Sequence, residues 1–236
     1  MPTAEEWLAG ATVAPEVAAL RPDYRALLVV VEPLAPGPSD DASEALLSDA
    51  EARARAALGD GPPEALPEVA AWREAYRAFG AKPQRTRPSV EALLRRVGAG
   101  LPRVDRVTDA YNAVSLAHLL PLGGEDLDAY AGPPRLVRAR GDEPFDTVAG
   151  GEPVVEHPEP GEVVWADDAG VTCRRWNWRQ CTRTRITTDT TRAVFVLDGL
   201  DPLGVDGLQA AGEALVAALT AASPGARASR RLLVPG

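Results

Sequence analysis

Residues 173–192, CRRWNWRQCTRTRITTDTTR, concentrate side chains that bind ligands. Two tryptophans, Trp176 and Trp178, flank Asn177, and the segment holds six arginines against one acid. Aromatic rings offer stacking surfaces, and arginine forks bind carboxylates or phosphates through paired hydrogen bonds. Strand alternation would place the two tryptophans on one face and Asn177 with Arg179 on the other. The residues alone fit an edge strand covering a core as well as they fit the wall of a binding site.

The residue spacings typical of metal sites, phosphate-binding loops and catalytic triads are missing from this sequence. His118 and His157 lie far apart, and the two cysteines are eight residues apart, which matches no zinc site. No glycine-rich phosphate loop is present, since Gly123-Gly124 reads only as a turn. A catalytic triad on Ser115 would have to use His118, which a helix-surface position explains better. We therefore expect no metal and no cofactor.

Charge is unevenly distributed along the 236 residues, whose formal net charge is −9. Residues 1–70 hold thirteen acids and four arginines, whereas residues 73–106 carry a net charge of +6 and residues 172–192 one of +5. Because binding responds to the local field, two basic segments on an acidic body remain compatible with a nucleic-acid partner. No apolar run is long enough for a membrane span, and the acidic N-terminus does not resemble a signal peptide, so we expect a cytoplasmic protein.

Hydrophobic periodicity and turn residues predict a mixed order of elements. Helices are expected over 42–58, 67–80, 89–97, 109–119 and 207–219. Strands are expected over 25–31, 135–140, 162–166, 171–176, 193–197 and 231–234, with 167–170 as a hairpin turn and 150–161 as a surface loop. Because strands and helices do not alternate strictly, we predict an α+β fold with a mixed sheet and packed helices.

Five segments of this chain carry a family resemblance. They are YRAFGAKPQRTRPSVEALLRRV (76–97), DAYNAVSLAHLLPLGGEDLD (109–128), GDEPF (141–145), GEVVWADDAGVTCRRWNWRQ (161–180) and TDTTRAVFVLDGL (188–200). Together they resemble a free-standing B3/B4 domain, the editing module of the β subunit of bacterial phenylalanyl-tRNA synthetase. The resemblance spans residues 65–220, which predicts a B3/B4-like domain over 65–236 and an N-terminal α/β segment, 1–64, packed on it.

The resemblance implies a pocket that recognises a wrong amino acid on a charged tRNA and hydrolyses its ester with an ordered water. Asn112 matches an asparagine of the family's motif helix, and residues 121–126 match the turn that follows. The family's histidine after the proline is replaced here by the sequence Leu122-Gly123-Gly124-Glu125. The family's pocket glutamate aligns near residues 182–184, which include no acid.

The site implied by the resemblance needs no covalent nucleophile, because orientation and preorganised donors lower a barrier by themselves. Asn112 and Asn177 would bind the amino group and ester carbonyl, and Arg179 would face the oxyanion or the terminal phosphate. Glu125 or Asp126 would hold the ammonium group or orient water. The expected substrate-binding residues are Ser115, Trp176, Trp178 and Thr184, and the expected RNA-binding residues are Lys82, Arg85, Arg87, Arg183 and Arg185.

These observations favour a hydrolase that deacylates misacylated tRNA in trans, with tRNA as its partner and without ligase activity of its own. Two alternatives stay open at this point. The chain could be a non-catalytic module that binds tRNA or an amino acid, or a pocket protein for an unrelated small molecule. Each candidate residue also has a structural explanation, such as a helix cap or a solvated surface position. The sequence does not indicate an oligomeric state.

Overall fold

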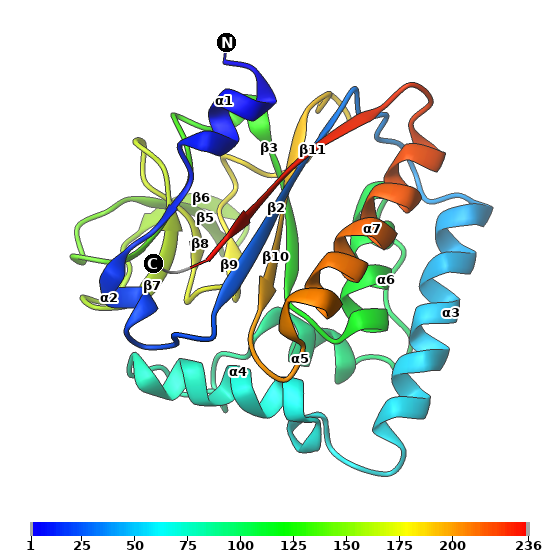
Figure 1. The fold of residues 1–236 in the computed structure, drawn as a ribbon, viewed down its shortest axis with the longest axis horizontal. Helices are drawn as coiled ribbons and strands as arrows, with labels where there is room; N and C mark the ends of the chain where they lie inside the picture. The colour runs from blue at the N-terminus through cyan, green and yellow to red at the C-terminus, as the bar shows by residue number, and fades with distance from the viewer. Residues whose placement is uncertain (1, 235–236) are drawn as a thin grey trace.

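The computed structural model describes residues 2–234, which build a central four-stranded sheet between a helical layer and a smaller β lobe (Figure 1). In spatial order the strands of the central sheet are β11 (Arg227–Leu233), β2 (Arg25–Glu32), β10 (Ala193–Gly199) and β3 (Leu122–Asp126). All of their pairings are antiparallel. The apolar run of β2 is buried on both faces, as expected for a strand inside a covered sheet.

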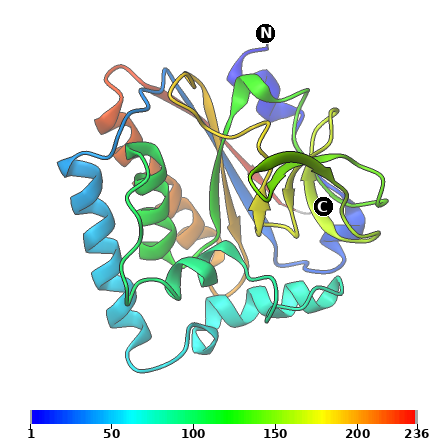
Figure 2. The same ribbon diagram turned by 180° about the vertical axis from the view of Figure 1, so that it is seen from behind.

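One face of the central sheet is covered by helices (Figure 2). The helices of this layer are α7 (Gly204–Ala222), α6 (Arg106–His118) and, outside α6, α3 (Asp41–Leu58). Alternate residues of β2 and β10, such as Leu27 and Phe195, point into this layer and pack against Leu215 of α7. The period-2 pattern of each strand therefore divides its side chains between two cores.

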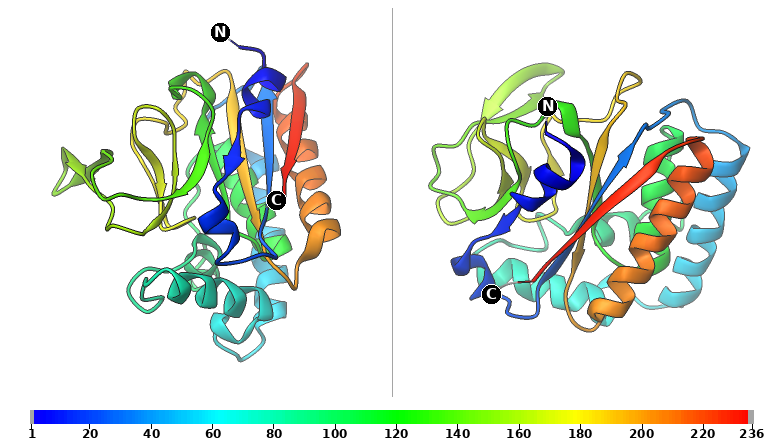
Figure 3. Two further views of the ribbon diagram at one scale, coloured as in Figure 1. Left: turned by 60° about the vertical axis from the view of Figure 1, so that its left-hand side comes forward. Right: turned by 45° about the horizontal axis from the view of Figure 1, so that its top comes forward.

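The other face of the central sheet carries the β lobe (Figure 3). Its five-stranded sheet is ordered β1 (Thr12–Val13), β4 (Arg135–Arg138), β7 (Val163–Ala166), β8 (Val171–Arg174) and β9 (Arg179–Gln180). A separate hairpin is formed by β5 (Phe145–Ala149) and β6 (Glu152–Glu156). Leu28 and Val194 of the central sheet share a core with Leu136 and Trp165 of the lobe.

The remaining helices of the described residues are shorter. They are α1 (Ala4–Ala9), α2 (Pro15–Ala18), α4 (Pro67–Ala78), α5 (Ser89–Leu94) and the 3₁₀ turns η1 (Pro63–Ala65) and η2 (Leu127–Ala129). Trp72 and Tyr76 of α4 are buried in the core shared with the β lobe. None of the helices among residues 2–234 is long and apolar enough to span a membrane.

The α+β fold with a mixed sheet is confirmed, but three local predictions were wrong. Gly123 and Gly124 lie in strand β3 rather than in a turn. The expected surface loop 150–161 contains strand β6. Residues 175–178 form a turn instead of continuing a strand. The division at residue 64 stays a prediction, and β2 and α3 from before it share cores with later elements.

Candidate active site

A cavity of about 90 Å³ lies between the central sheet and the β lobe. Its floor is formed by alternate residues of β3 and β10 on one face of the central sheet. In these two strands Gly123 pairs with Val196 and Glu125 pairs with Val194. We call this space the sheet–lobe cavity. It is lined by Ser89, Leu122, Gly123, Glu125, Trp165, Cys173, Trp176, Asn177, Trp178, Arg179, Gln180, Val196 and Asp198.

The turn 175–178 forms one wall of this cavity. The Trp178 amide donates to the Arg174 carbonyl over 3.0 Å, and Arg175 and Trp176 adopt positive φ angles of 49° and 70°. Such angles are costly for residues other than glycine and are kept only where the surroundings fix them. Trp176 supplies that constraint, because its buried ring meets Tyr24 edge-on at 5.0 Å. The predicted alternation of the two tryptophans with Asn177 is therefore wrong.

Asn177 is held at the centre of a buried hydrogen-bond chain. The Tyr76 hydroxyl donates to Asn177 Oδ1 over 3.0 Å, and Asn177 Nδ2 donates to Asp198 Oδ2 over 3.2 Å. The Tyr24 hydroxyl donates to the other oxygen of Asp198 over 2.5 Å. Burial raises the pKa of Asp198 to about 7, although these donors oppose the shift. Two tyrosines of the core thus fix the orientation of the cavity's amide and of one carboxyl group.

Glu125 occupies the cavity without a cationic partner among the described residues. Its side chain is buried, the Tyr130 hydroxyl donates to Oε2, and Oε1 has no hydrogen-bond partner. Burial raises the pKa of Glu125 to about 8, although nearby Thr184 and Arg183 oppose the shift. The free protein therefore keeps this carboxyl largely protonated at neutral pH.

Gly123 leaves room for Gln180 in the cavity wall. A Cβ at position 123 would lie 2.7 Å from Gln180 Nε2, which donates to the Gly124 carbonyl over 3.1 Å. The Gln180 amide therefore occupies the space that a side chain at position 123 would take. This is the position where the resembling family carries histidine.

Cys173 and Arg179 complete the polar lining. Burial raises the pKa of the Cys173 thiol well above its ordinary value, so this group stays protonated at neutral pH and is a poor nucleophile. Arg179 binds Glu156 over 2.6 Å and lies over the Trp178 ring, while its Nε has no hydrogen-bond partner. One N–H of this cavity-lining guanidinium therefore has no acceptor among the described residues.

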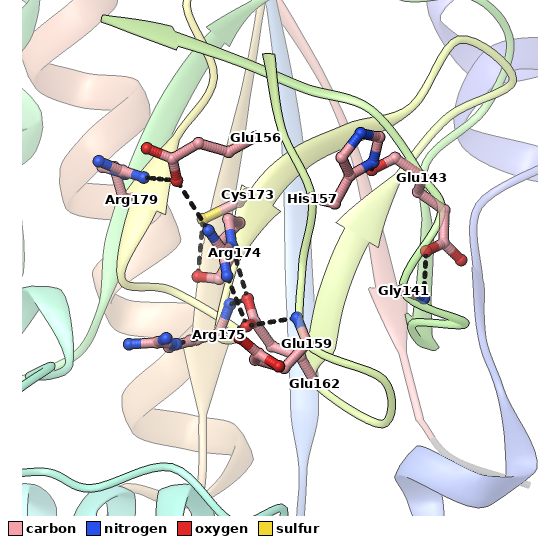
Figure 4. Close-up of polar contacts among 10 residues, drawn as sticks. All are labelled: Gly141, Glu143, Glu156, His157, Glu159, Glu162, Cys173, Arg174, Arg175 and Arg179. Carbon is pink, nitrogen blue, oxygen red and sulfur yellow. Dashed lines mark hydrogen bonds and ion pairs between the residues drawn. The ribbon is translucent and has the colours of Figure 1, made fainter. Parts of the chain in front are cut away.

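Behind the turn, acidic side chains neutralise most of the arginines (Figure 4). Arg174 lies between Glu156 and Glu162, with contacts of 2.9 Å to each. Arg175 is 3.4 Å from Glu162 and stacks on the Trp178 ring at 4.6 Å. We call this group the Glu162 network. It explains why the strongly basic sequence of the turn does not make a strongly basic surface.

A second, larger hollow of about 410 Å³ lies on the outer side of the same turn, where Arg175 lines it. Lys82 and Arg85 also line it, and both are exposed without an ion-pair partner among the described residues. We call this space the outer hollow. Its full lining is Phe79, Gly80, Ala81, Lys82, Arg85, Thr86, Glu159, Pro160, Glu162 and Arg175.

The other predicted RNA-binding arginines are placed differently. Arg87 is 3.5 Å from the buried Glu91, and Arg183 binds both oxygens of Asp167 at 2.8–2.9 Å. Arg185 is exposed, away from both hollows. The structure therefore brings only Lys82 and Arg85 together beside a hollow, and the RNA-binding role of all five residues stays a prediction.

The structure brings Glu125, Trp176, Asn177, Trp178 and Arg179 to one cavity. Four other predicted site residues are not part of its lining, and their role in the site stays a prediction. Asn112 lies on α6 in the helical layer, and Ser115 donates to the Leu120 carbonyl over 2.6 Å. Asp126 accepts from Thr190 over 2.6 Å, and Thr184 is buried behind Glu125 beside Cys181.

Asp198 and Gln180 are cavity residues that sequence reasoning did not single out. An acid inside the apolar strand sequence AVFVLDG is the signal that indicates Asp198, because buried acids in strands need a specific reason. Gln180 carries no comparable signal, since its role depends on the missing side chain of Gly123.

The fold and the cavity define an α+β domain with a small, partly open cavity lined by aromatic and polar side chains. The model of the B3/4 domain matches residues 71–211, well over half of the chain, so the chain belongs to the B3/4 domain family. A similar solved structure is an N-terminal fragment of the phenylalanyl-tRNA synthetase β subunit from Pyrococcus horikoshii, at 14% identity and a TM-score of 0.45. The alignment covers 92% of this chain and 49% of that one, so the chain spans about half of its length. No curated protein matches the chain.

Proposed function

We propose that this chain binds the aminoacylated 3′ end of tRNA and hydrolyses misacylated aminoacyl-tRNA in trans. One observation carries the proposal: the turn 175–178 separates a small polar cavity from a hollow that presents two unpaired cations. The cavity suits an aminoacyl group, and Lys82 and Arg85 suit the phosphates of the strand that delivers it. Membership of the B3/4 domain family supports this assignment.

Ester hydrolysis in this cavity needs donors for the developing oxyanion and an acceptor for the proton of the attacking water. Asn177 and Arg179 both line the cavity, and we assign Asn177 Nδ2 and the unpaired Arg179 Nε as these N–H donors. Asp198, whose pKa is about 7, accepts the proton as water adds to the carbonyl carbon. The carbon–oxygen bond to the ribose then breaks, and the proton passes to the departing ribose oxygen. No covalent intermediate is required.

The test is deacylation of a panel of mischarged tRNAs by the purified protein, with Asn177→Ala and Arg179→Ala as variants. Removing one oxyanion donor typically costs about 2.7–4 kcal/mol, a rate loss of roughly 10²–10³. Each variant's melting temperature is measured in parallel, because Asn177 also links buried Tyr76 and Asp198. Full activity per folded molecule in both variants would remove these residues from the site.

The alternative function is a non-catalytic module that binds tRNA or an amino acid. It differs from the proposal in one measurable respect: the wild-type protein would bind tRNA but hydrolyse no member of the panel above the uncatalysed rate. Under that outcome the same two substitutions would weaken affinity rather than a rate. The third possibility, a pocket for an unrelated small molecule, predicts no tRNA binding at all.

A further inference from the structure

The sheet–lobe cavity has an excess of acid over available base. Glu125 and Asp198 both line it and are 3% and 2% exposed, yet neither forms an ion pair within the described residues. The one cationic side chain of the lining, Arg179, is bound to Glu156 outside the cavity. A buried carboxyl group without a cation or a full set of donors stays neutral by keeping its proton, and a ligand cation can take the place of that proton.

Glu125 is the group with bonding capacity left. Asp198 already accepts hydrogen bonds at both oxygens, from Tyr24 and Asn177. Glu125 accepts from Tyr130 at Oε2, and Oε1 is buried with no partner at hydrogen-bond geometry, although hydrogen bonding from nearby Thr184 and Gln180 opposes the rise of its pKa. Gly124 faces the helical layer on the other side of the sheet, and the space beside Gly123 is taken by the Gln180 amide. An unsatisfied acceptor that lines a cavity marks the contact point of a ligand donor.

The cavity also contains donors suited to the opposite end of a small polar ligand. Arg179 Nε and Ser89 Oγ are buried without partners, and Asn177 Nδ2 has a second hydrogen beyond the one given to Asp198. A ligand that combines a cation with a carbonyl group would therefore satisfy both parts of the lining. An α-aminoacyl group has this combination.

We propose that the sheet–lobe cavity binds the ammonium group of a compact aminoacyl moiety on Glu125, with release of the Glu125 proton. This inference rests on the proposed function for the identity of the ligand, and it specifies the substrate class. The volume of about 90 Å³ is smaller than the 150 Å³ cavity that accommodates a benzene ring, so we assign to it small aliphatic or hydroxyl side chains. Aromatic aminoacyl groups should bind more weakly.

Proton release follows from the state of the free protein. Burial, opposed by Thr184, Arg183 and Gln180 and assisted by Asp167, raises the pKa of Glu125 to about 8. Cys173 beside it stays protonated at neutral pH because burial raises its pKa, and burial also raises the pKa of Asp198, the other acid of the lining. An arriving ammonium ion favours the carboxylate, so the carboxyl proton passes to solvent at pH 7. Affinity for a cation should consequently rise with pH up to about 8.

The probes are L-alaninamide, its uncharged N-acetyl derivative and L-phenylalaninamide, added to the full-length protein. Isothermal titration calorimetry at pH 7 in phosphate and in Tris gives the number of protons released, and tryptophan fluorescence reports occupancy beside Trp176 and Trp178. We expect L-alaninamide to bind at least about tenfold more tightly than either other probe, a difference of 1.4 kcal/mol. Close to one proton should be released for each ligand bound.

Glu125→Gln keeps the shape of the side chain and should lower L-alaninamide affinity at least tenfold and abolish proton release. Asp189→Asn, on the exposed surface, is the matched control and should change neither quantity. Equal binding of the N-acetyl derivative, proton uptake, no binding of L-alaninamide, or unchanged affinity in folded Glu125→Gln would each overturn the inference. If L-alaninamide binds as expected but no mischarged tRNA is hydrolysed, the proposed function fails and the ammonium site stands. If tRNA is deacylated without this dependence on Glu125, the inference alone fails.

Discussion

The Glu162 network and the sheet–lobe cavity both contain buried acids, but only the acid of the network is paired with cations. Glu162 is bound by Arg174 and Arg175 and also accepts from a backbone amide, so its charge is fully compensated inside the fold. Glu125 is equally buried but has one hydroxyl donor and no cation among the described residues. The difference indicates that the first group maintains the fold, whereas the second is completed by a ligand.

The largest expected effect is a loss of stability when the Glu162 network is broken. Arg174→Leu would leave Glu162 buried without its main partner, because Arg174 contacts both of its oxygens. We expect a loss of about 3–5 kcal/mol in the free energy of unfolding. Urea denaturation measures this loss. The control is Arg135→Leu, which removes the exposed pair with Asp168 and should cost at most about 1 kcal/mol. Equal losses in the two variants would contradict the comparison.

The fold was largely predictable because its strands are long apolar runs with clear alternation. The position of β2 in the chain and the hairpin turn 167–170 follow directly from that pattern. The Glu162 network was not predictable, because its acids come from β6 and from residue 162, and β6 lies in a segment rich in glycine and proline. Local sequence charge therefore overestimated the basic character of the turn.

The candidate site was only partly predictable for a similar reason. Asn177 and Arg179 follow from an aromatic, arginine-rich segment, but the positive φ angles at Arg175 and Trp176 depend on burial of the Trp176 ring. Asn112 belongs to the resembling motif, yet the alternation of β3 and β10 places the cavity on the sheet face opposite the helical layer that contains α6. The motif alone does not indicate on which face of the sheet the cavity lies.

The second effect concerns the sheet–lobe cavity, where Glu125 should make the stability of the protein depend on pH. The folded protein binds the Glu125 proton more tightly than the unfolded chain, since its pKa rises from 4.5 to about 8. This contribution to stability is complete below about pH 4.5 and is lost as pH rises to about 8, at up to roughly 1.4 kcal/mol per pH unit. Urea unfolding from pH 5 to 9 should show a shallower decline for Glu125→Gln than for wild type. Parallel declines would show that Glu125 is already compensated.

A third, smaller effect on stability concerns the cavity wall, where Gly123 packs against Gln180. Gly123→Ala would place its Cβ against Gln180 Nε2 and displace the hydrogen bond to the Gly124 carbonyl. We expect a loss of about 1 kcal/mol in unfolding free energy. In the Gln180→Ala background the clash is absent, so the same change should be nearly neutral. A thermodynamic double-mutant cycle measures this coupling, and additive losses would show that the two residues do not share the space.

The smallest effect separates unpaired from paired cations in RNA binding. Lys82→Ala and Arg85→Ala should each flatten the log–log dependence of tRNA affinity on salt by about one unit, with little change in stability. Arg183→Ala is the matched comparison, because Arg183 is bound to Asp167, and it should lower stability while leaving the salt dependence unchanged. Filter binding over a salt series measures these slopes. The reverse pattern would assign RNA contact to the ion-paired Arg183 rather than to Lys82 and Arg85.

Single-turnover deacylation of mischarged tRNAs tests the central claim most directly, with small and aromatic aminoacyl groups compared on the same tRNA. The wild-type protein should hydrolyse the small aminoacyl esters above the uncatalysed rate, and the rate should saturate with enzyme concentration. Combined replacement of Lys82 and Arg85 by alanine should raise the half-saturating concentration and leave the maximal rate unchanged, because these residues bind the strand outside the cavity. Hydrolysis of no ester by the wild-type protein would contradict the account.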